Sequence, residues 1–279
     1  MLFPHHLVLI RGGGDLATGV AYRLHVAGFP IIVTELSHPL VVRRRVALAS
    51  AVTDGAVVIE DMTGVHVETP DEALDLASSG IIPVLVAPQL PESLFDSSHT
   101  TRYSSLILVD ARMAKRNIDT RIDQASLVIA LGPGFTAGID SHAVIETNRG
   151  HRLGRVIWSG MPEPNTGTPG VVAGKGSERV LRAPVEGQVA WHKEIGERVE
   201  SGEKIGTVSG LAVEAPFEGV LRGLIAPGTT VKSGLKIGDV DPRIDSEACF
   251  TISDKALSIG GGVLEAILSY LNTRQANKS

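Results

Sequence analysis

Two stretches of the chain repeat each other at a fixed offset of 32 residues, from Ala183 to Ala215. Each begins with the pattern Ala-Pro-x-Glu-Gly, and each continues into a glycine, a valine, a Ser-Gly pair and a Lys-Ile-Gly triplet at matching positions. A repeat this short cannot bury an apolar face by itself, so the two copies must pack on each other. The sequence therefore predicts one small β domain, built from two half-modules, over residues 179–243.

Composition and charge limit the class of protein. The chain has 279 residues, of which 43% are apolar, and this is enough for about two domains of roughly 150 residues each. The net charge is −5 and the longest basic run is 43–45, so neither a nucleic-acid partner nor a membrane is expected. The N-terminus lacks the basic start of a signal peptide, and no apolar run reaches the ~20 residues of a membrane span. We therefore expect a cytoplasmic protein.

The first 160 residues alternate between apolar runs and helical patterns. Strands are expected over 6–10, 30–34, 83–87, 106–110 and 127–131, and helices over 16–26 and 70–78, the second with Thr69 as its N-cap. Strands that are apolar throughout are typical of a parallel sheet covered by helices on both faces. The fold class expected is thus α/β: a Rossmann-like, mostly parallel sheet domain over residues 1–160.

The rest of the chain divides into three parts. Residues 161–178 are rich in Gly and Pro and predict a linker, residues 179–243 form the repeat domain, and residues 244–279 form a C-terminal helical segment. A helix is expected over 254–272, capped by Ser253 or Asp254. The glycines at 260–262 cost about 1 kcal/mol each inside a helix. Either another segment approaches them closely, or the helix begins after them.

A glycine cluster follows the first predicted strand. Gly12, Gly14 and Ala17 match the spacing G-x-G-x-x-G/A, in which glycines permit a tight turn and close approach of a diphosphate to a helix N-terminus. Glu35 ends the second predicted strand, where a carboxylate can bind a ribose hydroxyl. The residues expected at this cofactor site are Gly12, Gly13, Gly14, Asp15, Leu16, Ala17 and Glu35, with Arg43 for a 2′-phosphate or another anion. The alternative is a glycine turn that binds nothing, with 43–45 as a solvated basic face.

A second glycine turn, at 132–138, follows the strand expected over 127–131. In a parallel sheet both turns lie at the carboxyl ends of strands and can face one crevice. The loop at 110–117 follows another such strand. From these two loops we expect Gly132, Gly134, Phe135, Thr136, Lys115 and Asn117 to contribute to the same site. The charged loop 110–117 is equally compatible with simple solvation.

The repeat domain resembles the biotinyl and lipoyl carrier domains and related barrel-sandwich hybrid modules, through its Ala-Pro-x-x-Gly openings and its glycine turns. In those carriers a lysine on the hairpin between the two halves is covalently modified. Here the hairpin falls near 208–213, and no lysine occurs between Lys204 and Lys232. The resemblance therefore implies the fold without biotin or lipoate, and the domain is expected to act as a lid, a docking surface or a spacer.

Segments along nearly the whole chain resemble the YqeB family of the selenium-dependent molybdenum hydroxylase system. They are residues 9–19, 129–138, 144–156, 239–243, 252–256 and 261–266. The resemblance implies an accessory role in maturation of a molybdenum hydroxylase client, in which the chain handles a molybdopterin cofactor or its terminal sulfur or selenium ligand. Sulfur or selenium transfer needs a nucleophile, and Cys249 is the only cysteine. A helix N-terminus and Lys255 nearby are expected to lower its pKa, although a buried, inert thiol is the commoner case.

Three functions follow from these observations. The first is an accessory protein that binds NAD(P), another nucleotide or a molybdopterin cofactor at the glycine turns. The second is an NAD(P)-dependent oxidoreductase, although no Tyr-x-x-x-Lys pair accompanies the turn. The third is a non-catalytic scaffold. No metal site is predicted, because the histidines lack ligand spacing, and the sequence leaves open whether the chain forms a homo-oligomer.

Overall fold

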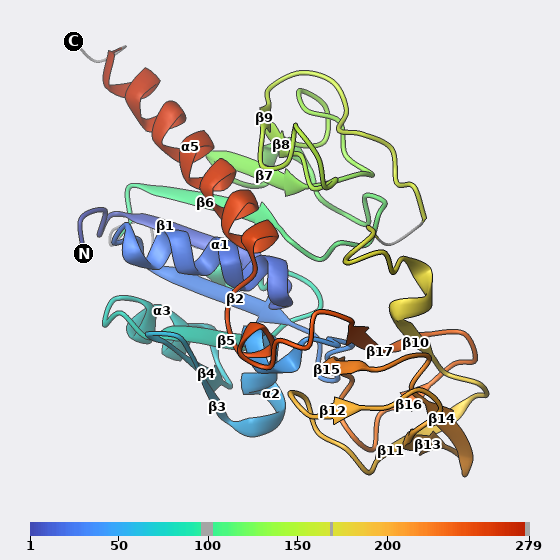
Figure 1. Cartoon of the computed structure of the whole chain (residues 1–279). Coiled ribbons are helices and arrows are strands. Elements are labelled where there is room, and N and C mark those ends of the chain that lie inside the picture. The colour runs from blue at the N-terminus through green and yellow to red at the C-terminus, as the bar shows by residue number, and fades with distance from the viewer. Residues whose placement is uncertain (96–102, 168–169, 277–279) are drawn as a thin grey trace. The chain divides into compact units, whose positions relative to one another are not determined.

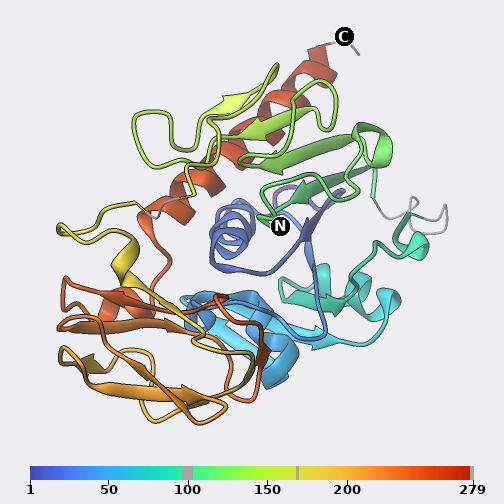
Figure 2. The same cartoon turned by 90° about the vertical axis from the view of Figure 1, so that its right-hand side faces the viewer.

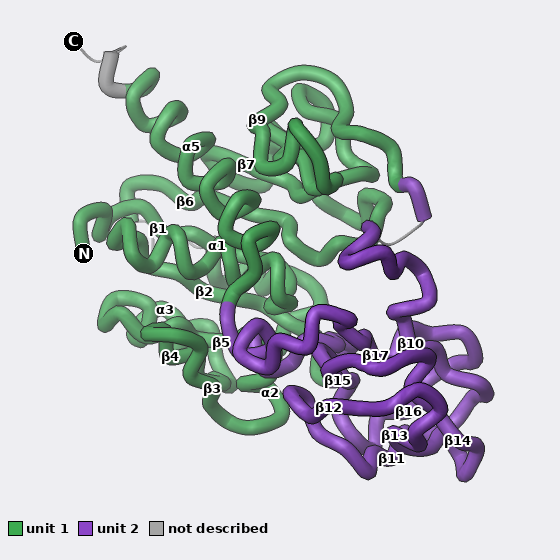
Figure 3. The backbone as a smooth tube through the Cα atoms, viewed as in Figure 1, with its two compact units in different colours: residues 1–37, 48–165, 252–279 green, residues 38–47, 166–251 purple. Residues whose placement is uncertain are grey.

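The computed structural model describes residues 1–95, 103–167 and 170–276, and the chain folds into two compact units. The first unit comprises residues 1–37, 48–165 and 252–279, and the second comprises 38–47 and 166–251 (Figure 3). The boundaries of this division differ from the expected ranges. Residues 38–47, most of the expected linker and residues 244–251 belong to the second unit, and the C-terminal helix belongs to the first. A linear pattern cannot show on which unit such a segment packs.

The first unit is an α/β structure built on one sheet (Figure 1). Its strands and helices are β1 (His6–Arg11), α1 (Asp15–Val26), β2 (Ile31–Glu35), α2 (Ala51–Asp54), β3 (Ala56–Ile59), β4 (Met62–Val67), α3 (Pro70–Ala77), β5 (Ile82–Val86), β6 (Ser105–Asp110), β7 (Leu127–Leu131), β8 (Ala143–Ile145), β9 (Val156–Ile157) and α5 (Asp254–Ala276). All five apolar strands expected from the sequence are present, each within one residue of its predicted ends at either side.

The order of strands in this sheet is β3-β4-β5-β2-β1-β6-β7-β8-β9. The strands from β4 to β8 run parallel, and only the two edge strands, β3 and β9, pair antiparallel with their neighbours. The strands that follow β1 in sequence, β2 to β5, lie on one side of β1 in the sheet. The later strands, β6 to β9, lie on its other side. Arg11 and Asp110, the last residues of β1 and β6, are partners in register at this point of reversal.

Both faces of the sheet are covered, which explains why the strands lack polar alternation. Leu7 and Leu9 of β1 join a buried cluster with Ala73 and Leu74 of α3. Because successive side chains alternate, Val8 and Ile10 point to the opposite face, and both are fully buried. The N-cap of α3 is the predicted one: the Thr69 hydroxyl accepts a hydrogen bond from the Glu72 amide at 3.2 Å.

The long C-terminal helix α5 runs alongside α1 (Figures 1 and 2). It begins as expected, because the Ser253 hydroxyl accepts a hydrogen bond from the Ala256 amide at 3.2 Å. The helix continues through residues 260–262, and two of these glycines meet backbone from other segments: Gly260 meets the carbonyl of Gly19, and Gly262 meets that of Gly154. Close approach is therefore the reason for glycine at these two positions. Within the described part of the chain, no helix combines the length and apolarity needed to cross a bilayer.

The second unit consists of two small antiparallel sheets. Its strands are β10 (Val180–Arg182), β11 (Gly187–Trp191), β12 (Arg198–Val199), β13 (Lys204–Val208), β14 (Leu211–Glu214), β15 (Gly219–Leu224), β16 (Thr230–Val231) and β17 (Lys236–Asp241). One sheet has the order β10-β17-β15-β12 and the other β14-β13-β11-β16. Each short strand, β12 or β16, thus pairs within the sheet formed mainly by the other copy of the repeat. The two copies interleave around one apolar core.

The hydrogen bonds of the two copies are equivalent at the repeat offset. The Gly196 amide donates to the Leu221 carbonyl, and the Gly228 amide donates to the Val189 carbonyl, both at 2.8 Å. The copies thus form the same contacts reciprocally, as a two-fold arrangement requires. The hairpin between them turns at Ser209 and Gly210, which both have positive φ. No lysine stands at the position where a carrier domain would be modified.

Candidate functional site

The turn after β1 packs on the loop that follows β6. Gly12 has φ +89°, and a Cβ there would lie 3.1 Å from the Arg112 Cα and 3.2 Å from the Ala111 carbonyl oxygen. The left-handed backbone and the crowding both explain why glycine is needed. The turn therefore lies beside the β1–β6 pair, which is the point where the strand order reverses. In open α/β sheets such a point is where ligands bind.

Glu35 lies at this turn. Its carboxylate accepts hydrogen bonds from the Gly13 amide at 2.6 Å, through Oε2, and from the Leu36 amide at 2.8 Å, through Oε1. A Cβ on Gly13 would lie 2.8 Å from the Ala49 amide nitrogen, so this position too has no room for a side chain. The structure thus brings together the glycine turn and the acidic residue that the spacing singled out.

The start of α1 has no side-chain cap. Gly14 is the N-cap residue, with extended backbone angles of φ −66° and ψ 178°, and it supplies no side-chain acceptor. Asp15 and Leu16 form the start of the helix, while Ala17 is buried at 1% exposure and packs the helix in place. A helix N-terminus carries a partial positive charge and orphan amide donors. Its chemistry suits an anion.

A partly buried network of charges closes the carboxyl ends of β1 and β6. Arg11, 2% exposed, donates two hydrogen bonds to the Asp119 carboxylate at 2.7 and 3.0 Å. Arg112 binds Asp110 at 2.6 Å and also contacts Asp119 at 2.8 Å, while the Thr120 hydroxyl donates to Asp110 at 2.6 Å. The hydrogen bond from Arg11 is the main reason that the pKa of Asp119 is lowered. This network holds the two strand ends in a fixed geometry.

The loop from β6 is strained and tied to the turn after β7. Lys115 has φ +60°, and its side chain is exposed. A Cβ on Gly134, φ +105°, would lie 2.5 Å from the Arg116 Cα. Asn117 donates to Asp140 at 2.9 Å and to the Thr120 carbonyl at 2.8 Å, and its own amide oxygen accepts from the Thr120 amide. Non-glycine residues with positive φ occur more often at functional sites, although they also occur in structural turns.

The other predicted residues of the turn after β7 pack against neighbouring residues or form internal hydrogen bonds. Gly132, φ +71°, leaves no space for a Cβ because the Thr147 hydroxyl fills it. Phe135 is 3% exposed and belongs to a small apolar cluster. The Thr136 amide donates to the Asp140 carboxylate at 2.7 Å. The three loops therefore meet in pairs, because Gly12 packs on Arg112 and Gly134 packs on Arg116. Phe135, however, lies in an apolar cluster, and Asn117 makes hydrogen bonds within its own surroundings.

Lys255 lies in the first turn of α5, in the first unit. The sequence had suggested it only as a cation near Cys249. Burial lowers the pKa of its ammonium, and the Arg149 guanidinium lowers it further, while Asp15 at the start of α1 and Glu146 act in the opposite direction. Among the described residues no hydrogen bond or ion pair holds this ammonium. Arg149 itself is paired with Asp254 at 2.7 Å. Lys255 therefore supplies a cation close to the start of α1.

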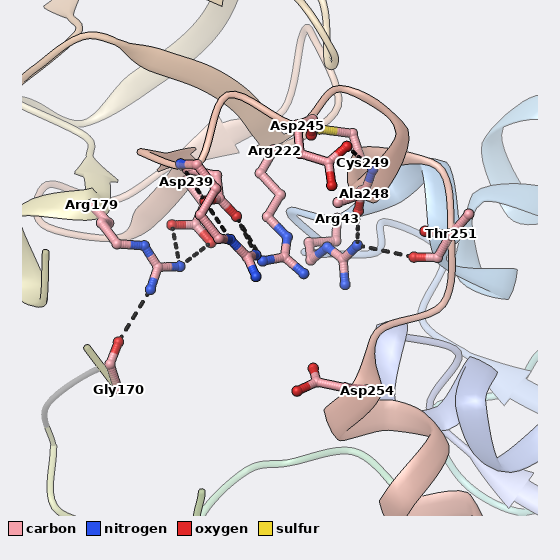
Figure 4. A network of polar contacts seen from close by, with 12 residues as sticks. Arg43, Gly170, Arg179, Arg222, Asp239, Asp245, Ala248, Cys249, Thr251 and Asp254 are labelled. Carbon is pink, nitrogen blue, oxygen red and sulfur yellow. Dashed lines mark hydrogen bonds and ion pairs between the residues drawn. The ribbon is translucent and has the colours of Figure 1, made fainter. Parts of the chain in front are cut away.

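Two predicted residues, Arg43 and Cys249, lie in the second unit (Figure 4). The Arg43 guanidinium donates to the backbone carbonyls of Ala248 at 3.1 Å and Thr251 at 3.3 Å. The Cys249 thiol is 1% exposed, and its sulfur lies 3.7 Å from the Leu221 carbonyl oxygen. Burial raises the pKa of this thiol, so the expectation of a lowered pKa is wrong.

Sequence reasoning did not find the Arg11–Asp119 pair, whose members stand 108 positions apart. The available signal was a charged residue at the end of an otherwise apolar strand. Such a residue is uncommon in a buried strand unless it is paired. Lys255 could have been noticed as a cation in the first turn of a helix, where acidic residues are favoured.

The chain matches a known protein along nearly its whole length. It is 47% identical over 268 residues to the uncharacterised protein YqeB of Escherichia coli (strain K12), and the match covers 96% of this chain. This similarity supports the YqeB family assignment. The chain spans about half of that relative, 48% of its length. No family model matches the chain.

Similarity to solved structures is weak. A succinylglutamate desuccinylase/aspartoacylase from Rhodobacter sphaeroides gives a TM-score of 0.22 at 23% identity, over 30% of this chain and 29% of that one. The ectoine utilization protein EutE (DoeB) from Ruegeria pomeroyi gives a TM-score of 0.23 at 11% identity, over 85% of this chain and 57% of that one. Scores this low carry no argument about fold or function.

Proposed function

We propose that the first unit is a Rossmann-like domain that binds a nucleotide, with its diphosphate at the N-terminus of α1. The observation that carries this proposal is the position of the Gly12–Gly14 turn beside the point where the strand order reverses between β1 and β6. Backbone crowding at Gly12 and the absence of a side-chain cap at Gly14 leave the helix start suited to an anion.

Two side chains support the same site. Glu35 is fixed to the turn by its bond with the Gly13 amide, and its remaining lone pairs are suited to a ribose hydroxyl. Lys255 places a cation near Asp15, at the start of α1. NAD(P), another nucleotide and a molybdopterin dinucleotide all contain the diphosphate and hydroxyl groups that this arrangement would recognise.

We further propose that the chain serves as an accessory protein in maturation of molybdenum hydroxylases, a role that rests on the resemblance to the YqeB family. The second unit is proposed to be a barrel-sandwich hybrid of the biotinyl/lipoyl type without carrier chemistry. The Ser209–Gly210 turn supports this, because it has no group that biotin or lipoate could modify. Cys249 is not assigned a catalytic role, because its thiol is buried and its pKa is raised.

The nucleotide site is tested by calorimetry and thermal shift with NAD(H), NADP(H), ATP and a molybdopterin dinucleotide. The decisive variant is Gly14→Asp, since aspartate is a favourable N-cap, better than glycine by roughly a few tenths of a kcal/mol, yet its charge repels a diphosphate. Gly14→Ala is the matched control. We expect Gly14→Asp to keep its fold and lose binding, whereas Gly14→Ala retains most of it. Binding of none of these ligands by the wild type, or equal binding by Gly14→Asp, would favour a scaffold role.

The accessory role needs a separate measurement. Deletion of the gene in its own organism is expected to lower the activity of a molybdenum hydroxylase while the amount of that enzyme stays unchanged. Full activity and full cofactor content in the deletion strain would contradict this role without affecting the nucleotide site.

A further inference from the structure

A small cavity lies beside the edge strand β9, outside the glycine turns. Its volume is about 280 Å³, and it is lined by Glu146, Arg152, Arg155, Ile157, Met161 and Glu163. This is close to the lower end of the size range for small-molecule sites. All of the lining residues belong to the first unit.

The two carboxylates of the cavity are held in place by hydrogen bonds. Glu146 is 1% exposed, and its oxygens accept from the Asn148 amide and the Glu163 amide, each at 2.7 Å. The Glu163 carboxylate accepts from the Asn148 side chain at 2.6 Å through one oxygen, Oε2. Its other oxygen has no hydrogen-bond partner among the described residues. Carboxylates fixed in this way are preorganised acceptors for a ligand's donors.

The two arginines of the cavity differ in their pairing from Arg11, Arg112 and Arg149, each of which is paired with a carboxylate. Arg152 and Arg155 are exposed, and neither guanidinium has a hydrogen-bond or ion-pair partner within the described residues, although two carboxylates line the same cavity. Their backbones are fixed: the Arg155 carbonyl accepts from the Glu146 amide at 3.0 Å, and the Arg155 amide donates to the Arg152 carbonyl at 3.0 Å. Guanidinium groups with free donors match the oxygens of phosphates and carboxylates.

We propose that this cavity binds a small molecule that carries an oxyanion at one end and hydroxyl or N–H donors at the other. Arg152 and Arg155 hold the oxyanion, and the free oxygen of Glu163 accepts from the donors. Ile157 supplies an apolar wall, and Met161, which is 67% exposed, supplies an apolar rim. None of the residues that line this cavity belongs to the proposed nucleotide turn.

The oxyanion can come from a phosphate or from a carboxylate, and calorimetry with defined probes distinguishes the two. The probes are inorganic phosphate, ribose 5-phosphate, ribose and malate. We expect an oxyanion probe that also carries hydroxyl groups to bind, and ribose alone not to bind. Tighter binding of ribose 5-phosphate than of malate would identify phosphate as the preferred group, and the reverse order would identify carboxylate.

The double variant Arg152→Ala/Arg155→Ala removes both cations without changing the backbone hydrogen bonds. We expect it to bind the preferred probe at least about tenfold more weakly, because two charge-assisted contacts are lost. Arg198→Ala, at an exposed arginine of β12 in the second unit, is the control with the same type of substitution and is expected to bind normally. Thermal unfolding reports whether each variant is folded.

Two further variants separate the roles of the residues. Glu163→Gln keeps an acceptor for Asn148 and removes a like charge, so inorganic phosphate is expected to bind roughly threefold more tightly. Gly14→Asp is expected to leave binding of ribose 5-phosphate and malate unchanged, whatever its effect on nucleotides. The proposal is overturned if neither oxyanion probe binds the wild type, if the double variant binds as tightly as the wild type, or if Gly14→Asp abolishes the binding.

Discussion

The backbone carbonyl of Gly19 in α1 lies against the Cα of Gly260 in α5, with no room for a Cβ between them. The contact is reciprocal, because a Cβ on Gly19 would lie 2.5 Å from the Ala256 carbonyl carbon. Close contact of this kind requires glycine on both helices. It also fixes the first turn of α5, which carries Lys255, relative to the start of α1.

The substitution Gly19→Ala is therefore expected to destabilise the protein. Alanine favours a helix by about 1 kcal/mol over glycine, but overpacking against a rigid backbone costs about 1–3 kcal/mol or more. The net loss should appear as a lower midpoint in urea denaturation. Gly261→Ala is the matched control, because a Cβ on Gly261 meets no atom within 4 Å. That variant should be as stable as the wild type or more stable by up to about 1 kcal/mol. Equal effects at both positions would contradict the packing described here.

The pair formed by Arg11 and Asp119 gives a prediction about acid stability. Asp119→Asn leaves Arg11, which is 2% exposed, without its bidentate carboxylate. Breaking a fully buried pair costs about 3–5 kcal/mol, but Asp119 is 44% exposed, so solvent screening reduces the expected loss to roughly 1–3 kcal/mol.

This loss should depend on pH with a defined sign. The pKa of Asp119 is lowered in the folded protein, so its contribution is complete above the unfolded-state value of about 3.9. The contribution disappears as the pH falls through the lower folded-state pKa. Free energies of unfolding for wild type and Asp119→Asn should thus differ by a constant amount from about pH 5 to 7 and converge in stronger acid. A difference that persists below pH 3 without change would rule out this explanation.

Cys249 is expected to react slowly with thiol reagents in the folded protein. It is 1% exposed, and burial raises its pKa, so little thiolate is available for attack. Labelling with Ellman's reagent at pH 8 should be at least about tenfold slower than in urea, because it requires local opening. An exposed control is Ser233→Cys in a Cys249→Ala background, which should label rapidly without denaturant. Rapid labelling of native Cys249 would restore the hypothesis of a reactive nucleophile.

The sequence was informative wherever a single local cause decides the structure. The strands of the first sheet were predictable because both faces are covered and the apolar runs are continuous. The cap at Thr69 was predictable because the N-cap, the proline and the acidic first turn are adjacent in sequence. The repeat predicted one module with two equivalent halves for the same reason.

Features that depend on contacts between distant segments could not be predicted from the local sequence. The glycines of α5 indicated that something approaches the helix, but nothing in the sequence identifies Gly19 and Gly154 as the partners. The Arg11–Asp119 pair and the cavity at Glu146 arise from loops that the sheet brings together. The raised pKa of Cys249 could not be predicted, because burial cannot be seen from its neighbours along the chain.

The internal repeat predicts equal responses at equivalent positions. Gly202 and Gly234 both have φ +79°, a Cβ at either would meet nothing within 4 Å, and each amide donates to the alanine that opens the other copy, at 2.8 Å. Gly202→Ala and Gly234→Ala should therefore each lose about 1–2 kcal/mol of stability through backbone strain alone. Asparagine, which tolerates this conformation better, should cost less at both sites. Urea denaturation of the four variants checks this, and clearly unequal losses would show that the two halves are not equivalent.

Lys255 differs from Asp119 because its lowered pKa marks a charge that the folded protein disfavours. Burial and the Arg149 guanidinium lower the pKa of its ammonium, so the folded protein binds this proton less tightly than the unfolded chain does. Stability therefore rises with pH from the lowered folded-state pKa up to the unfolded value of about 10.4. Lys255→Met removes this partly buried charge and should be more stable than the wild type at neutral pH, by an amount that shrinks as the pH approaches 10.

Arg149→Ala separates burial from the charge of the neighbouring guanidinium. Because Arg149 is a secondary cause of the lowered pKa, its removal should raise the pKa of Lys255 part of the way toward the ordinary value. NMR titration of the lysine ε-carbon signals, with Lys255→Met to assign the resonance, measures this directly. A Lys255 signal that titrates at the ordinary lysine value in the wild type would contradict the buried environment.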